Sequence, residues 1–420
     1  MTGLVCDIDE HGSVRAKAYM TLKPLHRILL LPTGLIVLFF LAATPAFASC
    51  QNEFQPSAAD PLQMLVLGDS IMWGQGLREE EKFSSRVKCW LQEKTNREVK
   101  VHVEAHSGAA IVADSAAMLS FTTAAGEVNL ATPTVNEQLD NAIRFYKEDR
   151  SSPALILMDG CINDVGVKNL LAASTPLEEI RARARKSCGE DMYGLLQRVR
   201  RSFSQAYVLV TSYYPIVSPQ TGDNAFLRLL VKKLNNQKPE ARRMSDKEMR
   251  ARLIAISDEW YKTSTASLLR AVAKANAETA SESSFPRVAF VEIQFGPEHV
   301  FAAPDTLLWN FMFASTNLSG FAKVIVLLSF GTAAYKTNDH VRESRIKSCE
   351  QTFKKPKGIK EDKQQKNSRK DLFLICRYAS LGHPNQMGAL IYTEAIKAQL
   401  QQLIDKAGWK QNSSHPPSLQ

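Results

Sequence analysis

Four short polar segments of the sequence carry the residue types needed to transfer an acyl group. Such a reaction requires a nucleophile, a base that takes its proton, and hydrogen-bond donors for the oxyanion of the tetrahedral intermediate. Ser70 offers a hydroxyl, His383 an imidazole, Asn163 a side-chain amide, and Gly108 a backbone N–H that no side chain crowds. Each residue alone is also typical of an ordinary turn, so the chemistry depends on whether the fold brings them together.

The first three segments follow apolar runs that have the length and composition of buried strands. Five such runs are expected to be strands: Met64–Leu67, Val99–Val103, Ala154–Met158, Ala206–Val210 and Val288–Ile293. Helical patterns lie between them, over Val135–Lys147, Leu177–Phe203 and Ser245–Ala277. The last begins with Ser245 and Glu248 at the spacing of a capping box.

Strands that alternate with helices predict an α/β fold whose parallel sheet is covered by helices on both sides. Ligands bind such sheets beyond the carboxyl ends of the strands. Ser70, Gly108 and Asn163 all come shortly after strand ends. The sequence therefore predicts one site at this edge of the sheet, with His383 as the base from the segment before the C-terminal helix.

In order, Gly68-Asp69-Ser70, Gly108, the run Gly160–Asp164 and His383-Pro384-Asn385 resemble the four blocks of the SGNH hydrolases, the GDSL-type esterases. The resemblance implies a flavodoxin-like three-layer α/β/α sandwich and hydrolysis of an ester. It implies Ser70 as the nucleophile, His383 as the base, and an oxyanion hole made of Ser70 N–H, Gly108 N–H and the Asn163 side chain. It implies no metal or organic cofactor.

The sequence departs from this family at one position. The family usually has an Asp three residues before the histidine, and this chain has Ser380 there. A buried Asp normally holds the imidazole in the right tautomer and stabilises its cation. Three alternatives follow: Ser380 accepts a hydrogen bond from the ring through its hydroxyl or carbonyl oxygen, a carboxylate such as Asp305 or Asp371 approaches from elsewhere, or activity is lost.

Other polar residues near these segments have either a substrate-side or a structural role. Asp69, Trp73 and Asp164 are candidates for lining the substrate site. The alternatives are local hydrogen bonding for the two aspartates and packing on the following helix for Trp73. His299 matches no block of the family pattern, and His106 is expected in the core or at the rim of the site.

Residues 1–49 read as a secretory signal peptide. Basic residues precede the apolar run Ile28–Leu41, and Ala46-Phe47-Ala48 follows it. Met20 makes a better start for such a signal than Met1, because the first nineteen residues include acids. A transmembrane anchor is the alternative, and lipid modification of Cys50 is a further one. The rest of the chain, 50–420, is expected to be one domain.

Export changes how the cysteines are interpreted, because disulfides form in oxidising compartments. Cys161 with Cys188 and Cys349 with Cys376 are the expected pairs, as neighbours within shared units of the sequence. Buried free thiols are the alternative. No Cys-x-x-Cys motif or His/Cys cluster has the spacing of a zinc site.

The formal net charge of +9 comes largely from one tract, Phe353–Lys370, which holds eight Lys or Arg residues. The tract lacks interleaved aromatic residues, so it predicts a solvated, partly disordered loop and no nucleic-acid site. Weak contact with an anionic membrane surface or a polysaccharide is an open alternative. The tract belongs to an expected insertion over about 302–371, and a helical insertion is expected over about 220–284.

The sequence thus predicts an exported serine esterase that acts on a small-molecule or polysaccharide ester. The alternatives are a catalytically inactive carbohydrate-binding or scaffold protein on the same fold, and an O-acyltransferase. The acyl group, the alcohol and the oligomeric state stay open.

Overall fold

The computed structural model describes residues 7–8, 14–15, 59–112, 126–149, 151–222, 244–278, 286–313, 335–355, 360–404 and 409. The chain divides into two units, Met1–Ala46 and Phe47–Gln420. In the first unit the described residues form two short antiparallel strands, β1 (Asp7–Ile8) and β2 (Val14–Arg15). The expected signal segment after Met20, and Cys50, lie outside the described residues.

The second unit is built on a parallel sheet. Its five strands are β3 (Leu62–Leu67), β4 (Val99–Val103), β5 (Leu155–Met158), β6 (Tyr207–Thr211) and β7 (Val288–Val291). They lie in the order β4-β3-β5-β6-β7, and every neighbouring pair is parallel. This is the flavodoxin-like order, in which ligands bind beside the first strand at its carboxyl end. The predicted fold class is therefore confirmed.

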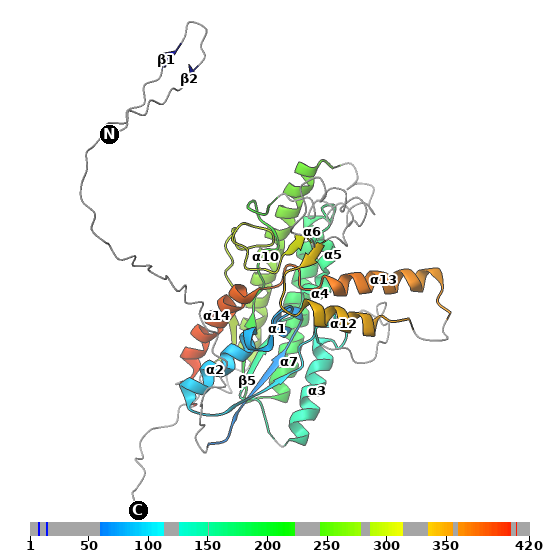
Figure 1. Ribbon diagram of the computed structural model, residues 1–420. Coiled ribbons are helices and arrows are strands. Elements are labelled where there is room, and N and C mark those ends of the chain that lie inside the picture. The colour runs from blue at the N-terminus through cyan, green and yellow to red at the C-terminus, as the bar shows by residue number, and fades with distance from the viewer. Residues whose placement is uncertain are drawn as a thin grey trace, which may run out of the picture. The chain divides into compact units, whose positions relative to one another are not determined.

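The central strands are largely apolar because both of their faces are covered. All residues of β5 and β6 are buried. On one side α2 (Phe83–Thr95) and α14 (Gln386–Ile404) pack against each other. The other layer contains α3 (Val135–Glu148), α7 (Met192–Ser202) and α10 (Asp246–Glu278), and Figure 1 shows the two groups of helices flanking the sheet.

The helix predicted over 177–203 is one continuous helix with an irregular turn inside it. It comprises α6 (Leu177–Ala184), a π-helical segment η2 (Arg185–Asp191) and α7. Cys188 lies in η2 and is bonded to Cys161, just after β5. The helix is thereby covalently joined to the carboxyl end of a central strand.

The first predicted insertion is helical where the structure describes it. Residues 244–278 hold α10, while 223–243 lie outside the described residues. The predicted capping box is present, since Ser245 N–H donates to Glu248 Oε2 (2.8 Å) and Glu248 N–H donates to Ser245 Oγ (3.3 Å). Trp260, in the middle of this helix, is fully buried.

The second predicted insertion is more ordered than the sequence suggested. It contains β8 (Phe311–Phe313) paired antiparallel with β9 (Tyr335–Thr337), then α12 (Arg342–Thr352) and α13 (Lys363–Arg377). The disulfide Cys349–Cys376 joins the two helices, so both predicted disulfides are confirmed. The apolar stretch over 324–330 lies outside the described residues.

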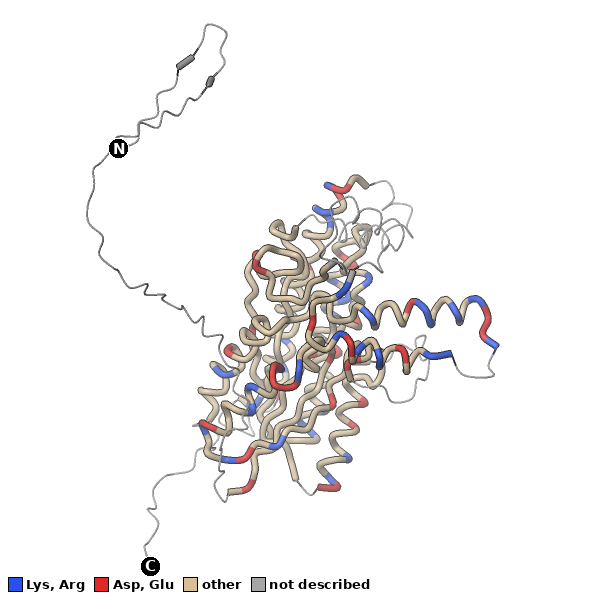
Figure 2. The backbone as a smooth tube through the Cα atoms, in the orientation of Figure 1, with Lys and Arg blue, Asp and Glu red and all other residues tan. Residues whose placement is uncertain are grey.

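The prediction of a basic loop is wrong for Lys363–Lys370, which form the first half of α13. The helix begins at a capping box, because Asp362 Oδ1 accepts from Gln365 N–H at 2.8 Å. Figure 2 shows the basic residues along α13, which projects beside α12 away from the sheet. The tract is solvated as predicted, but it is a helix held by a cap at one end and a disulfide at the other.

The remaining short helices are α1 (Ser70–Trp73), η1 (Glu79–Glu81), α4 (Ile162–Val165) and α5 (Val167–Leu170). Two of them, α1 and α4, begin directly after the central strands β3 and β5. Over the described part of the chain, no helix is both long and apolar enough to cross a bilayer.

Candidate active site

Ser70 is the first residue of α1, immediately beyond the carboxyl end of β3. Asp69 caps this short helix, accepting from Ile71 N–H at 2.8 Å. Gly68 has a positive φ of 146°, and a Cβ there would lie 2.0 Å from Asp159 Oδ1. Only glycine fits this approach, which lets the chain turn sharply and present Ser70 at the end of a buried strand.

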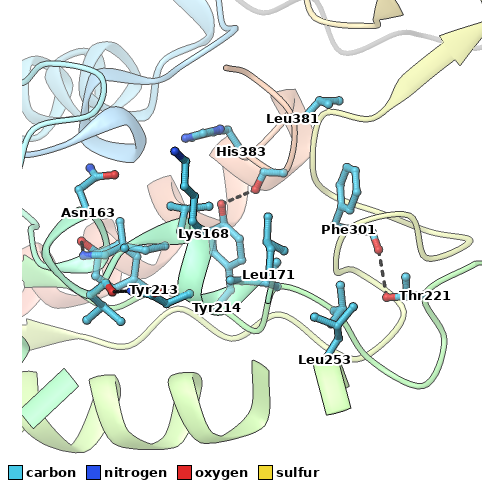
Figure 3. Close-up of a pocket in the computed structure, with 18 of the residues that line it drawn as sticks. Asn163, Lys168, Leu171, Tyr213, Tyr214, Thr221, Leu253, Phe301, Leu381 and His383 are labelled. Carbon is cyan, nitrogen blue, oxygen red and sulfur yellow. Dashed lines mark hydrogen bonds between the residues drawn. The ribbon is translucent and has the colours of Figure 1, made fainter. Parts of the chain in front are cut away.

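His383 lies beside Ser70 although 313 residues separate them, and its Nε2 is 2.7 Å from Ser70 Oγ. The loop that carries His383 is fixed by backbone bonds to Trp309: Trp309 N–H donates to His383 O (2.7 Å) and Gly382 N–H donates to Trp309 O (3.0 Å). Tyr214 Oη adds a hydrogen bond to Gly382 O (2.8 Å), drawn dashed in Figure 3. The predicted nucleophile and base are therefore in hydrogen-bonding contact.

The imidazole of His383 is neutral at pH 7. Burial lowers its pKa to about 4, and the carbonyl groups of Ser380 and Leu381 oppose this only in part. A neutral ring can accept the Ser70 proton at Nε2, which assigns the ring hydrogen to Nδ1. The pair thus has the protonation state that a nucleophile and its base require.

Two backbone N–H groups at the site are available to a ligand. Gly108 has a φ of 86°, and a Cβ there would lie 2.7 Å from Leu130 O, so glycine is required. Neither Gly108 N–H nor Ser70 N–H donates to another of the residues that the structure describes. Both belong to segments that follow neighbouring strands, β4 and β3.

Asn163 comes from the third strand end, on α4 after β5. Its Nδ2 donates to Ala109 O at 2.9 Å, which ties the amide to the residue after Gly108 and leaves its second N–H for a ligand. Cys161, which precedes this helix, has a φ of 111°, an unfavourable conformation for a residue other than glycine. The disulfide to Cys188 holds the backbone here, where it redirects the chain after β5.

Asp69 and Trp73 do not line the cavity at Ser70, and Asp164 does. The carboxylate of Asp69 is fully buried beneath Ser70. Trp73 packs beside Lys82 and donates from Nε1 to Glu127 Oε2 (2.8 Å). Asp164 accepts from the N–H groups of Ile111 at 2.9 Å and Val112 at 3.2 Å, and burial raises its pKa to about 6.

A pair of buried carboxyl groups supports the nucleophile turn from below. Asp159 Oδ1 accepts from Asp69 N–H (2.8 Å), and Tyr213 Oη donates to Asp69 Oδ2 (2.7 Å). Burial raises the pKa of Asp69, and burial together with the charge of Asp69 raises that of Asp159 well above its ordinary value. These groups build the turn and do not reach the reacting atoms.

The site opens into a cavity of about 960 Å³. Ser70, Asn163 and His383 line one part of it, and Figure 3 shows Leu253 well below His383, with Leu171 and Tyr214 between them. Most of the other lining side chains are apolar or aromatic, including Ile162, Val165, Leu171, Tyr213, Tyr214, Ile216, Val217, Leu253, Phe301 and Leu381. The lining also includes the charged residues Asp164, Lys168, Arg183, Asp246, Lys247 and Arg250. The apolar part of the lining suits an apolar group of a ligand.

The other histidines and carboxylates named from the sequence lie elsewhere. His299 faces Glu298 at 3.6 Å, and His106 is buried with Nδ1 2.9 Å from Ser107 O. Asp305 and Asp371 are both exposed, and neither is a main cause of the shift in the pKa of His383.

The carboxylate whose charge acts on His383 is Asp339, with the guanidinium of Arg345 beside it. Sequence reasoning missed both residues. Asp339 lies between Asn338 and His340 in the second insertion, and no motif or spacing marks it.

No family model and no curated protein matches this chain. Among solved structures, the chain is similar to the lipase Lip_vut3 from a goat rumen metagenome, with 18% identity, a TM-score of 0.33, and coverage of 58% of this chain and 88% of that one. It is similar to an extracellular lipase from Streptomyces rimosus, with 16% identity, a TM-score of 0.34, and coverage of 59% of this chain and 87% of that one. It is also similar to a putative GDSL-like lipase from Parabacteroides merdae, with 11% identity, a TM-score of 0.28, and coverage of 77% of this chain and 98% of that one. With TM-scores this low, the functional assignment rests on the geometry of the site in this chain.

Proposed function

We propose that this protein is a serine esterase of the SGNH type. The observation that carries the proposal is the 2.7 Å contact between Ser70 Oγ and His383 Nε2 at the carboxyl end of the central strands. We assign Gly108 N–H, Ser70 N–H and the Asn163 amide as the oxyanion donors, because they follow three neighbouring strands and Asn163 Nδ2 bonds to the residue after Gly108. The order of these residues along the chain also matches the four sequence blocks of that family.

The reaction follows from these positions. Ser70 Oγ attacks the carbonyl carbon of the ester while its proton passes to His383 Nε2. The negative charge that develops on the carbonyl oxygen is stabilised by the three donors. His383 then gives the proton to the leaving alcohol, and water releases the acyl group from Ser70 by the same steps in reverse order.

The cavity supports an apolar acyl group as the part of the substrate that is bound. Its apolar lining begins at Ser70 and continues to Leu253 on α10. A volume of about 960 Å³ has room for an acyl chain much longer than acetyl. Leu253 is therefore expected to contact the far end of a long acyl chain.

Export is part of the proposal. The disulfides Cys161–Cys188 and Cys349–Cys376 support folding in an oxidising compartment. The signal-like segment over 28–48 supports the same conclusion. N-terminal sequencing of protein collected outside the cytoplasm tests this, and a chain that still begins at Met1 or Met20 would contradict it.

The central test is Ser70→Ala in the full chain. We expect wild-type protein to hydrolyse p-nitrophenyl esters and to be labelled by a fluorophosphonate probe, with both lost in the variant and thermal unfolding unchanged. Ser85→Ala, on α2 and away from the cavity, is the control and should keep both. Hydrolysis by the Ser70→Ala protein would contradict Ser70 as the nucleophile. Failure of the wild type both to hydrolyse the esters and to react with the probe would favour the binding or scaffold protein instead.

A further inference from the structure

The second ring nitrogen of His383 has no hydrogen-bond acceptor in the part of the chain that the structure describes. Its Nδ1 is buried and must carry the ring hydrogen, since Nε2 faces the Ser70 hydroxyl. The carbonyl groups of Ser380 and Leu381 stabilise the charged ring, although neither meets the geometry of a hydrogen bond to Nδ1. A base in this position needs a group that fixes the ring and offsets its charge when it accepts a proton.

Asp339 is connected to the His383 loop through Ser380. Ser380 Oγ donates to Asp339 Oδ2 at 2.7 Å, and both side chains are fully buried. The backbone N–H of His383 in turn donates to the backbone carbonyl oxygen of Ser380 at 3.0 Å. The residue at the family's acid position therefore contacts a carboxylate instead of being one.

Arg345 keeps Asp339 ionised. Its Nη1 and Nη2 each donate to one oxygen of Asp339 at 2.7 Å. Burial opposes ionisation, but these bonds outweigh it and hold the pKa of Asp339 below its ordinary value. At neutral pH an ionised carboxylate, paired with Arg345, therefore contacts Ser380, which lies three residues before the base in the sequence.

The same network reaches the nucleophile turn. Arg345 Nη1 also donates to Glu127 Oε1 (3.1 Å). Glu127 accepts from Trp73 Nε1 (2.8 Å) and from Gly76 N–H (3.1 Å), both just after Ser70. Polar contacts thus run without a break from the segment behind the nucleophile to the segment that holds the base.

We propose that Asp339 is the positioning residue for His383, acting through Ser380 in place of the family's direct acid. It fixes the His383 loop, and its charge stabilises the imidazolium that forms when the Ser70 proton moves to Nε2. Asp339 stays ionised and Ser380 keeps its proton throughout, so no other proton moves. This rests on the proposed esterase function.

The first test is Asp339→Asn, which keeps the shape and removes the charge. The charged groups acting on His383 are Asp339, which raises its pKa, and Arg345, which lowers it, with Glu127 behind Arg345. We expect kcat to fall on the order of 10-fold to 100-fold with KM little changed, less than the ~10⁴-fold effect of a direct acid. In a plot of kcat/KM against pH, the fall in rate on the acid side (the acid limb) reports protonation of His383. This limb should move to lower pH, because the remaining Arg345 charge opposes protonation of the ring.

Two further variants make the test specific. Adding Ser380→Asp to Asp339→Asn returns a carboxylate to the network and should recover most of the lost rate. Glu361→Gln is the matched control, since it breaks another two-point pair with an arginine, Arg369, in the same insertion (2.7 and 2.9 Å). It should leave kcat and the acid limb unchanged.

If Asp339→Asn does not fold, Ser380→Ala breaks the link and leaves the Arg345 pair intact, and its kcat should fall by about 5-fold or more. The proposal is overturned if the folded variant keeps kcat within about 2-fold, or loses rate without a shift of the acid limb and without rescue. Titration of the His383 ring by NMR separates the two proposals. A lower pKa in Asp339→Asn supports the positioning role even if no ester is hydrolysed, and an unchanged one contradicts it.

Discussion

The two sides of the site are held in different ways. Ser70, Gly108 and Asn163 follow three neighbouring strands, and the backbone geometry of the sheet brings them together. His383 instead depends on irregular segments and on charged side chains, chiefly Asp339 and Arg345. We call these the sheet side (Ser70, Gly108 and Asn163) and the base side (His383). The register of the strands fixes the backbone of the sheet side, whereas the base side needs individual contacts between residues far apart in sequence.

The sheet side is also tied by neutral groups. Gln138 on α3 accepts from Gly68 N–H (2.8 Å) and donates to Gly68 O (2.9 Å), while His106 N–H donates to the same carbonyl (3.0 Å). On the base side, the contacts between Arg345 and its two carboxylate partners are ion pairs. The sheet side also holds the carboxyl groups of Asp69, Asp159 and Asp164, but these bond to backbone N–H groups and a tyrosine. The comparison predicts that substitution of Asp339 or Arg345 acts mainly on the base, and amide substitutions mainly on the oxyanion hole.

The largest effect is expected for Asn163→Ala on the sheet side. Loss of one oxyanion donor typically costs about 10²–10³ in kcat. The acid limb of the pH profile should not move, because no charge near His383 changes. Asn141→Ala is the control: Asn141 lies on α3 away from the cavity, and its side-chain amide donates a hydrogen bond to Glu104 (3.0 Å). A loss within assay error would remove Asn163 from the oxyanion hole and weaken the comparison.

The disulfides Cys161–Cys188 and Cys349–Cys376 give a matched test of the two sides, because each spans 27 residues. In the loop-entropy account, each contributes about 3.5 kcal/mol to the free energy of unfolding. Replacing either pair by serines should therefore lower thermal stability similarly. Loss of Cys161–Cys188 should reduce kcat with the acid limb unchanged, whereas loss of Cys349–Cys376 frees the helix that carries Arg345 and should shift that limb.

Thermal unfolding and pH–rate profiles of the two double variants check this. Equal shifts of the acid limb in both would show that the two sides are not independent.

The smallest effect is expected far from both sides, at the end of the cavity. Leu253→Trp should lower kcat/KM for a p-nitrophenyl octanoate by about 10-fold, as a filled apolar subsite would. It should leave the acetate ester nearly unchanged. Leu269→Trp, on the same helix but about half exposed (51%), should change neither. If both esters respond alike to Leu253→Trp, that end of the cavity does not bind the acyl group.

The sheet side could be predicted from the sequence because its strands are short runs dominated by apolar and β-branched residues. The range expected for β4 is identical to the observed one, and the others differ by one or two residues at their ends. Ser70, Gly108 and Asn163 could then be placed, since parallel strands bring their carboxyl ends to one edge.

The contacts that hold His383 were harder to predict from the sequence than those of the sheet side. The sequence shows that Ser380 departs from the family pattern. Its hydrogen-bond partner Asp339, however, lies 41 residues away in an irregular segment, and no periodicity connects the two. The basic tract was interpreted by composition alone. The cap at Asp362 and the disulfide at Cys376 make it a helix, and neither depends on hydrophobic periodicity.

The long separation of Ser70 and His383 also sets an order on the synthesis of the protein. In the proposed mechanism, a chain elongated as far as α10 already contains Ser70 and the three proposed oxyanion donors, but no base. The segment over 335–383 brings Asp339, Arg345 and the imidazole of His383 in one late stretch. In that mechanism a growing chain does not hydrolyse esters until this segment has folded against Ser70.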